Sequence, residues 1–475
     1  MTHEVYIGKE VFQIQDEKYV ENEFYSPSSA YPEYCFDDIS EHKNHIYDSI
    51  RLAFMELGYD MENIGTSKWN PLGKFITKGQ KILIKPNLVL HENHIKENGI
   101  ECLITSPAVV RAVVDYCILA LKGEGKITIA DAPVQACNFD KLVEKSGYKK
   151  LISYYRKKGI DIELVDLREN EENQNAGIEI NVGEKSKFWG LAKERLKSLR
   201  VTNYDPCEMY EHHNQSKNAY YIARRVLEAD VIINMPKPKT HRKAGVTVSL
   251  KNMVGINANK AWLPHHSIEN FTDAGDAYRG RNLFKRIANI LLDFKNEKKL
   301  SKSKQRFIDS WILTFNRIGR YLHNDTNFEG SWYGNDTLWR TIVDLNNVVR
   351  YAKADGTMSK VQQRKIINIA DMIVCGEKEG PLSPTPKKVE AIVVAENSVA
   401  MDIVVALFMG IDYRKIPSIL NATKEISLFP GKIEDIIIKS NVKGWNNTSV
   451  GEFVKKDREN FLLSSGWEQC KNIHI

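Results

Sequence analysis

The chain has 475 residues, which is enough for two or three domains, and 42% of them are hydrophobic, as in an ordinary globular protein. The 67 basic and 61 acidic residues leave a formal charge of +6. This excess is spread along the chain without a basic tail or an aromatic-basic repeat. It therefore favours an anionic partner slightly and argues against dedicated nucleic-acid binding.

Cysteine usage indicates a reducing compartment. The seven cysteines are scattered, and no pair has Cys-x-x-Cys spacing. A disulfide scaffold, a zinc ribbon and an iron–sulfur cluster are therefore not expected. The N-terminal stretch is charged throughout and lacks the apolar core of a signal peptide, and no run of about 18 apolar residues occurs anywhere. We expect a soluble, cytoplasmic protein without a transmembrane segment.

Residues 1–75 predict an irregular N-terminal extension that contains one amphipathic helix at 42–57. In that helix Ile46, Ile50, Phe54 and Leu57 recur at spacings of four, four and three, which places them on one apolar stripe.

From residue 76 onward, short apolar runs alternate with helical patterns. The runs do not alternate between apolar and polar positions, which is typical of strands buried on both faces. Strand alternating with helix predicts an α/β fold with a mostly parallel sheet and helices on both faces. The expected strands are 81–85, 126–130, 162–165, 231–234, 367–374, 391–395 and 436–438, and the expected helices are 106–122, 139–158, 397–409 and 413–424.

The α/β core is expected in two parts, 76–264 and 356–475, the second of which includes a C-terminal tail. A helical insertion or cap at 265–355 separates them, and its charged piece at 295–306 is expected to be an exposed linker.

The insertion also carries an apolar stripe within 308–322, beside Arg306, Arg317 and Arg320. Packing of the insertion on the core explains such a stripe. Peripheral contact with a membrane surface is the alternative.

Polar residues follow several of the expected strands. Lys85-Pro86-Asn87 follows the first, Asp131-Ala132-Pro133 the second, and residues 235–241 and 375–381 follow two later strands. In doubly wound sheets the ligand lies beyond the carboxyl ends of the strands. Lys85 is expected to bind an anion there, and Asn87 to orient it.

The segment from Asn234 to Gly255 is the strongest candidate for a site. It contains Lys237, Lys239, His241 and Lys251, with Thr240 and Asn252 among them, and Pro236 and Pro238 stiffen its backbone. A short helix is expected at 246–253. Lysines beside the start of a helix suit a phosphate or a carboxylate. The alternative is a solvated basic loop after a strand.

Two carboxylates and one histidine complete the candidate set. Asp131 is a candidate general base, or it binds a divalent cation together with Glu379. His266 is expected to close over the lysines. The alternative for Asp131 is an ordinary turn or helix cap.

The strand-end segments, taken in order, resemble the DUF362 family of bacterial and archaeal proteins. The resemblance rests on Lys85-Pro86-Asn87, Thr105-Ser106-Pro107, Ala130-Asp131-Ala132-Pro133, Asn234 to His241, Gly245-Val246-Thr247, Leu250 to Gly255, Glu379 to Ser383 and Ser398 to Asp402. It spans roughly residues 80–420, and the block around Lys239-Thr240-His241 is its most specific part. Some relatives carry an added ferredoxin-like cysteine cassette. This sequence lacks the four-cysteine run, so no iron–sulfur cluster is implied here.

Three functions remain open from the sequence. The first is an enzyme that acts on a phosphorylated or carboxylated small molecule, with Lys85, Lys237, Lys239 and Lys251 binding the anion. His241 would act as acid or base because its ordinary pKa lies near neutrality. The second is electron transfer, by family analogy. The third is a non-catalytic anion binder or a scaffold at a membrane surface. Neither a Walker A motif nor G-x-G-x-x-G occurs, and the reaction and oligomeric state are left open.

Overall fold

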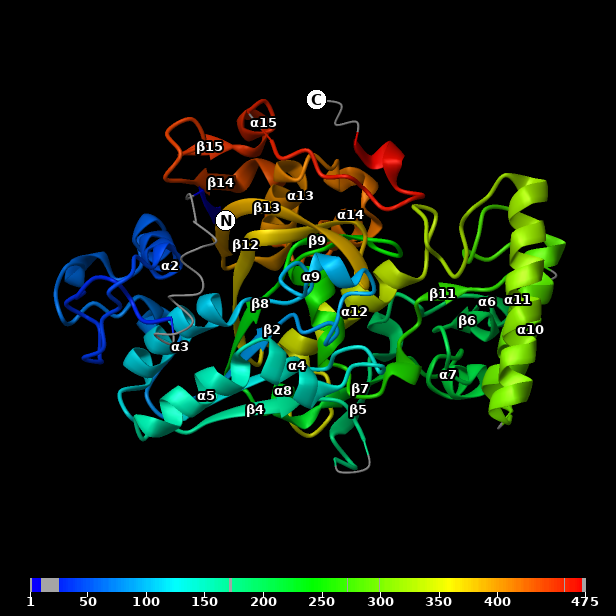
Figure 1. Cartoon of the computed structure of the whole chain (residues 1–475), viewed down its shortest axis with the longest axis horizontal. Helices are drawn as coiled ribbons and strands as arrows, with labels where there is room; N and C mark the ends of the chain where they lie inside the picture. Colours follow the sequence, from blue (N-terminus) through cyan, green and yellow to red (C-terminus); the bar gives the residue numbers. More distant parts are fainter. Residues whose placement is uncertain are drawn as a thin grey trace.

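The computed structural model describes residues 2–9, 25–170, 173–270, 272–298, 300–456 and 458–471. Within these ranges one large mixed sheet runs through the molecule in the order β15-β14-β1-β13-β12-β8-β2-β3-β4 (Figure 1). Its strands are β1 (His3–Lys9), β2 (Lys81–Pro86), β3 (Lys126–Asp131), β4 (Ile162–Asp166), β8 (Val231–Met235), β12 (Lys365–Glu379), β13 (Ser383–Ala395), β14 (Ile436–Lys439) and β15 (Thr448–Ser449).

The half of the sheet that holds the candidate residues is parallel. β12, β8, β2, β3 and β4 pair side by side in the same direction. The expected α/β fold with a mostly parallel sheet is confirmed, and each of the seven expected strands overlaps an observed one. Antiparallel pairing enters through β13, which lies between β12 and β1.

Two cores cover the two faces of this sheet. Along β2, Leu83 enters one core, whereas Ile82 and Ile84 enter the other. Because both faces are buried, the strands have continuous apolar runs. The core of Ile82 and Ile84 is covered by α2 (His45–Glu56), α3 (Pro107–Leu121) and α5 (Tyr148–Lys157), and the core of Leu83 by α9 (Ser249–Asn252), α12 (Leu338–Tyr351), α13 (Ser398–Phe408) and α14 (Pro417–Ala422).

Several expected helices differ in their bounds. The predicted helix over 139–158 is two helices, α4 (Phe139–Lys145) and α5, because Gly147 between them has a positive φ of 89°. The predicted helix over 413–424 is a 3₁₀ turn at Tyr413–Lys415 followed by α14. The stripe of α2 is buried as expected: Ile46, Ile50, Phe54 and Leu57 are at most 7% exposed.

The N-terminal extension is more regular than expected. Residues His3–Lys9 form β1, which pairs antiparallel with β13 and parallel with β14. The extension therefore supplies an internal strand of the sheet.

A short hairpin lies at the end of the parallel half. β9 (Lys239–His241) pairs antiparallel with β10 (Gly245–Thr247), and β9 also pairs with β12. The helix expected at 246–253 therefore begins only at Ser249, because the preceding residues pair as a strand. The remaining small elements are β5 (Gly177–Asn181) with β7 (Ala219–Ala223), β6 (Leu199–Arg200) with β11 (His266–Ser267), α6 (Lys193–Lys197), α7 (Pro206–His212), α8 (Arg224–Leu227) and α15 (Val450–Phe453).

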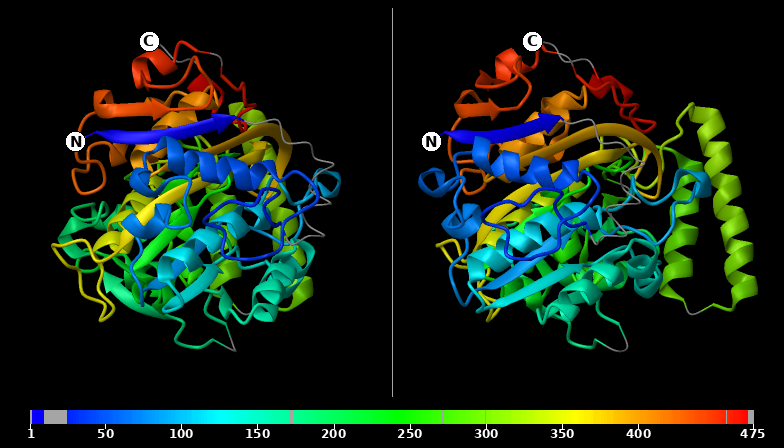
Figure 2. Two further views of the ribbon diagram at one scale, coloured as in Figure 1. Left: turned by 90° about the vertical axis from the view of Figure 1, so that its left-hand side faces the viewer. Right: turned by 60° about the vertical axis from the view of Figure 1, so that its left-hand side comes forward.

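Within the predicted insertion, α10 (Leu283–Glu297) and α11 (Lys302–His323) form an antiparallel pair at one edge of the molecule, while α12 packs in the main core (Figures 1 and 2). The linker expected at 295–306 is mostly helical, since α10 reaches Glu297 and α11 starts at Lys302. Across the described ranges, no helix has both the length and the apolar character that a membrane span requires.

Candidate functional site

The candidate site lies where the strand order reverses. The chain runs from β2 to β3 to β4 on one side and then returns as β8 on the other side of β2. Lys85 on β2 is directly opposite Asn234 on β8. A reversal of this kind opens a crevice at the carboxyl ends of parallel strands, which is where ligands of α/β sheets bind.

Lys85 and Asp131 form a buried ion pair in this crevice. The Nζ of Lys85 donates to Oδ1 of Asp131 at 2.6 Å, and both residues are buried. Oδ2 of Asp131 accepts the backbone N–H of Leu88 at 2.7 Å. Gly255 covers the pair, since a Cβ at that position would lie 2.1 Å from Oδ1 of Asp131. Burial lowers the pKa of Lys85, and Asp131 opposes that shift. The main observed task of Asp131 is therefore to hold Lys85.

Lys237 is matched in the same way. Its Nζ donates to Oδ2 of Asp371 at 2.8 Å, and that oxygen also accepts the backbone N–H of Ser106 at 2.7 Å. Both members of the pair are buried. In a buried ion pair whose hydrogen bonds are satisfied, the two charges compensate each other. Lys237 therefore adds no unpaired charge to the crevice.

Lys239 differs because it binds neutral groups. Its Nζ donates to Oδ1 of Asn87 and to the carbonyl of Leu103, and its side chain is fully buried. Burial, with a further contribution from the Lys237 ammonium, lowers the pKa of Lys239 to about 7. Lys239 is thus divided between its charged and neutral forms near neutral pH.

Two further lysines have no carboxylate partner among the residues that the structure describes. Lys260 donates to the carbonyls of Ala132 (2.8 Å) and Asn257 (3.2 Å), and burial lowers its pKa to about 7. The side-chain ammonium of half-buried Lys251 makes no hydrogen bond or ion pair within the described ranges. Burial, followed by repulsion from Lys85 and Lys243, lowers the pKa of Lys251 to about 8.

Two histidines beside these lysines are neutral. Within the described residues, one has a free hydrogen-bond donor on its ring, and the other has a free acceptor. Nδ1 of His241 accepts the backbone N–H groups of Lys243 (3.0 Å) and Ala244 (3.1 Å), so the proton of the ring is on Nε2. Burial, then Lys251 and His265, hold the pKa of His241 well below its usual value. The expectation that His241 titrates near neutrality is therefore revised, and its Nε2 is a hydrogen-bond donor.

His265 has the reverse arrangement. Its Nδ1 lies 2.7 Å from the carbonyl of Leu263, which requires an N–H there and leaves Nε2 as an acceptor. Burial and the ammonium groups of Lys251 and Lys243 lower the pKa of His265 to about 3.

Buried polar atoms without partners lie beside the same residues. Thr247 is directly opposite Lys239 in the β9–β10 pair, so their side chains leave the same face. Its Oγ1 and the Nδ1 of buried His266 have no hydrogen-bond partner in the described part of the chain. Buried polar groups are normally satisfied, and a bound ligand would supply the missing partners.

Three predicted residues have protein partners of their own. Thr240 points to the other face of β9, where its Oγ1 donates to the carbonyl of Lys378 at 2.8 Å. Asn252 accepts from Lys85 and donates to Oδ1 of Asn234, so its amide orients buried neighbours. Glu379 accepts the backbone N–H of Ser465 and lies 3.3 Å from Arg242.

The cation expected between Asp131 and Glu379 stays a prediction. Each carboxylate has its own partners, and the described ranges contain no group of three or more His, Cys, Asp or Glu side chains that could hold a metal ion.

Lys243, Lys260, His265 and Thr247 were not among the predicted site residues. Lys260 lies in a short 3₁₀ turn, and His265 lies directly before His266, which was predicted. Neither follows a strand, so the strand-end rule could not find them. The available signal was their position in the chain immediately after the block 245–255.

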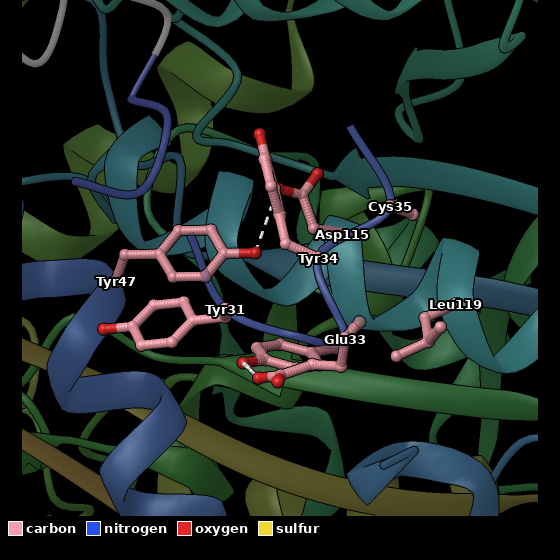
Figure 3. A pocket seen from close by; sticks show the side chains of 8 residues that line it. Tyr31, Glu33, Tyr34, Cys35, Tyr47, Asp115 and Leu119 are labelled. Carbon is pink, nitrogen blue, oxygen red and sulfur yellow. Dashed lines mark hydrogen bonds between the residues drawn. The ribbon is translucent and has the colours of Figure 1, made fainter. Parts of the chain in front are cut away.

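A separate small pocket lies against α2 and α3 (Figure 3). In it the Tyr47 hydroxyl donates to Asp115 and the Tyr116 hydroxyl to Glu33. These carboxylates are already paired, Asp115 with Arg111 and Glu33 with Arg51. The pocket is lined by Tyr31, Glu33, Tyr34, Cys35, Tyr47, Asp115, Tyr116 and Leu119.

A family model described as "Domain of unknown function (DUF362)" matches residues 82–198 and 171–407. A thylakoid-associated protein of Synechocystis sp. is 26% identical over 193 residues, which is 40% of this chain and 44% of that protein. The match thus spans less than half the length of this relative.

Two solved structures show a weaker likeness. The lactate racemase apoprotein of Thermoanaerobacterium thermosaccharolyticum has a TM-score of 0.32 at 12% identity, over 76% of this chain and 55% of that one. A protein from Thermotoga maritima has a TM-score of 0.29 at 10% identity, over 71% and 53%. Likeness at this level establishes no shared activity.

Proposed function

The chain belongs to the DUF362 family, whose function is unassigned, and we propose its function from the site. We propose that the protein binds a phosphorylated or carboxylated small molecule at the carboxyl ends of β2 and β8. The observation that carries this proposal is the unmatched positive charge. Lys239, Lys251 and Lys260 have no carboxylate partner in the described ranges, whereas Asp131 and Asp371 are taken up by other lysines.

Burial of these lysines, together with the positive side chains near them, favours an anion over a neutral ligand. The pKa values of Lys239, Lys251 and Lys260 all lie below the usual value for lysine, which means that the protein alone disfavours their charged forms. An anion that binds between them restores the charged forms and forms charge-assisted hydrogen bonds.

His241 and His265 would orient the ligand through hydrogen bonds. Nε2–H of His241 donates to an oxygen of the ligand, while Nε2 of His265 accepts from a hydroxyl or a protonated oxygen. If the ligand is also transformed, Lys239 and Lys260 are the residues suited to proton transfer, because a pKa of about 7 leaves both forms of each populated. No observation in the described ranges favours the electron-transfer alternative.

Isothermal titration of the full chain with inorganic phosphate, pyrophosphate or succinate, at constant ionic strength, tests the proposal. We expect saturable binding of at least one anion. Lys251→Gln should weaken it by about 10- to 100-fold, the value of one charge-assisted hydrogen bond.

The matched control is Lys81→Gln, at the exposed amino end of β2, which should leave the affinity unchanged. Absence of saturable binding for all three anions would overturn the proposal. Equal losses for Lys251→Gln and Lys81→Gln would also overturn it, because the effect would then be general electrostatics.

A further inference from the structure

The antiparallel pair of α10 and α11 is largely exposed. Of the 22 residues of α11, only Ile312 and Gly319 are buried. The two helices share a small core built on Ala288, Leu292 and Ile312. Figure 2 shows this pair standing at the edge of the molecule, with α11 on its outer side.

One side of α11 carries large apolar side chains in contact with solvent. Phe307, Trp311, Ile318 and Leu322 are 66%, 46%, 36% and 58% exposed. Their spacings of four, seven and four residues place them along one side of the helix. We call these four residues the α11 stripe.

The neighbouring helix also exposes large apolar side chains. On α10, Leu283, Ile290 and Phe294 are 65%, 56% and 46% exposed, at spacings of seven and four. Monomeric soluble proteins rarely expose large apolar patches, and rows of exposed apolar side chains on a helix pair mark a candidate interaction surface.

The charge of α11 indicates what the surface binds. The helix contains Lys302, Lys304, Arg306, Arg317 and Arg320 against a single acidic residue, Asp309. Asp309 lies 2.7 Å from Lys295 of α10, so its charge is neutralised within the pair. All five basic residues are exposed. The helix therefore carries large apolar side chains along one side, while Lys302, Arg306, Arg317 and Arg320 place most of its positive charge on another side.

We propose that α10 and α11 dock onto an anionic lipid surface. The α11 stripe inserts at the boundary between headgroups and acyl chains, and the exposed arginines and lysines contact the lipid phosphates. A lipid surface can bury the α11 stripe and bind the exposed basic residues at the same time, and it does not require a complementary groove. This proposal does not depend on ligand binding at the strand ends.

Co-sedimentation of the full chain with vesicles tests it. The chain should bind vesicles of equal parts phosphatidylglycerol and phosphatidylcholine at low salt, bind pure phosphatidylcholine far less, and be released by high salt. Removing the charges of Arg306 and Arg317 together (R306Q and R317Q) should weaken binding by roughly 30-fold, since each basic residue near such a surface contributes about fivefold.

The stripe is tested by Trp311→Ser and Phe307→Ser, which should each reduce binding. The matched control is Leu313→Ser, because Leu313 is 55% exposed on the same helix but on a different side. Thermal unfolding should be unchanged in all three variants, because each side chain is exposed.

Failure to bind the phosphatidylglycerol vesicles at low salt would overturn the proposal. An equal loss for Leu313→Ser and Trp311→Ser would also overturn it. A third contradictory result is a dimer in sedimentation velocity that Trp311→Ser abolishes, without vesicle binding by the parent chain. That result would assign the surface to a second copy of the chain.

Discussion

Four lysines at the strand ends are of two kinds. Lys85 and Lys237 each meet a buried carboxylate, whereas Lys239 and Lys251 do not within the described ranges. The first kind stabilises the crevice, because a buried charge with a partner avoids the cost of an isolated one. The second kind supplies the charge that an anion can use.

Anion affinity should fall as the pH rises. The pKa values of Lys239 and Lys260 are about 7 and that of Lys251 is about 8, so these residues are largely charged at pH 6 and lose their charge between pH 7 and 9. Titration calorimetry at pH 6, 7, 8 and 9 measures this decline. Lys251→Arg keeps its charge throughout and should flatten the profile above pH 7. An affinity that is constant from pH 6 to 9 would contradict the assignment.

Gly255→Ala should destabilise the protein by about 1–3 kcal/mol, the usual cost of overpacking. The added methyl group would meet Oδ1 of Asp131 at 2.1 Å and Nζ of Lys85 at 2.7 Å, so the ion pair must move. Urea unfolding measures the change. Gly451→Ala is the control, since nothing lies within 4 Å of its Cβ position. A loss below 0.5 kcal/mol, roughly the noise of a neutral surface change, would show that the pair adapts.

The residues of the site were only partly predictable from the sequence. Lys85, Asp131, Lys239 and His241 lie at or just beyond the carboxyl ends of the expected strands, and the rule for parallel sheets gathers such residues at one edge. Their pairing was not predictable, because Asp371 reaches Lys237 across 134 positions of sequence. The protonation of His241 depends on two backbone N–H groups that only a tight turn brings to Nδ1.

At the scale of elements, the short helix α9 positions Lys251. The start of α9 is held by a carboxylate that is distant in the sequence. Buried Asp402 on α13 accepts the backbone N–H groups of Ser249 (2.8 Å) and Leu250 (3.2 Å) at the start of α9. A carboxylate at the start of a helix satisfies N–H groups that have no partner within the helix. Lys251 therefore owes its position partly to α13.

Asp402→Ala should lower the free energy of unfolding by about 1–2 kcal/mol, as for loss of a helix cap, and should also weaken anion binding because Lys251 shifts with α9. Chemical unfolding and titration calorimetry measure the two effects. Asp412→Ala is the control: Asp412 is also buried and caps the turn at Tyr413–Lys415. It should cost stability without loss of affinity. Unchanged affinity in Asp402→Ala would separate α9 from the site.

The longer elements were the predictable ones. Apolar runs buried between two cores and the stripe of α2 have clear patterns, and they appear where expected. β9 and β10 have three residues each, too few to show a period, and pairing with β12 decides their structure. The charged segment at 295–306 contains few apolar residues, but contact between α10 and α11 extends both helices into it.

At the scale of the whole molecule, the sheet joins distant parts of the chain. β1 lies between β13 and β14, with Val5 opposite both Ala395 and Ile438. Val5 and Ile7 are fully buried in the main core. No local pattern predicts such a pairing, because its partners are more than 380 positions away.

Ile7→Ala should therefore destabilise the protein by about 2–5 kcal/mol, the usual cost of truncating a buried isoleucine. Limited proteolysis should show faster cleavage near β14 and β15, which are attached to the rest of the sheet through β1. Glu4→Ala is the control, because Glu4 is exposed on the same strand and its contact with Lys439 of β14 is a surface ion pair, which contributes little. Unchanged cleavage near β14 would mean that packing on α13 suffices to hold it.

The place of β1 also sets an order of events during synthesis. The residues that become β1 are synthesised long before the neighbours on both of their edges, because their partners in β13 and β14 lie more than 380 positions later in the chain. Until those strands have been made, this segment, in which Val5, Tyr6 and Ile7 are consecutive apolar residues, lacks its partners in the sheet. Unpaired apolar strands invite association with other chains. Nascent chains of this protein should therefore need a chaperone at the β1 segment until β13 and β14 have been made.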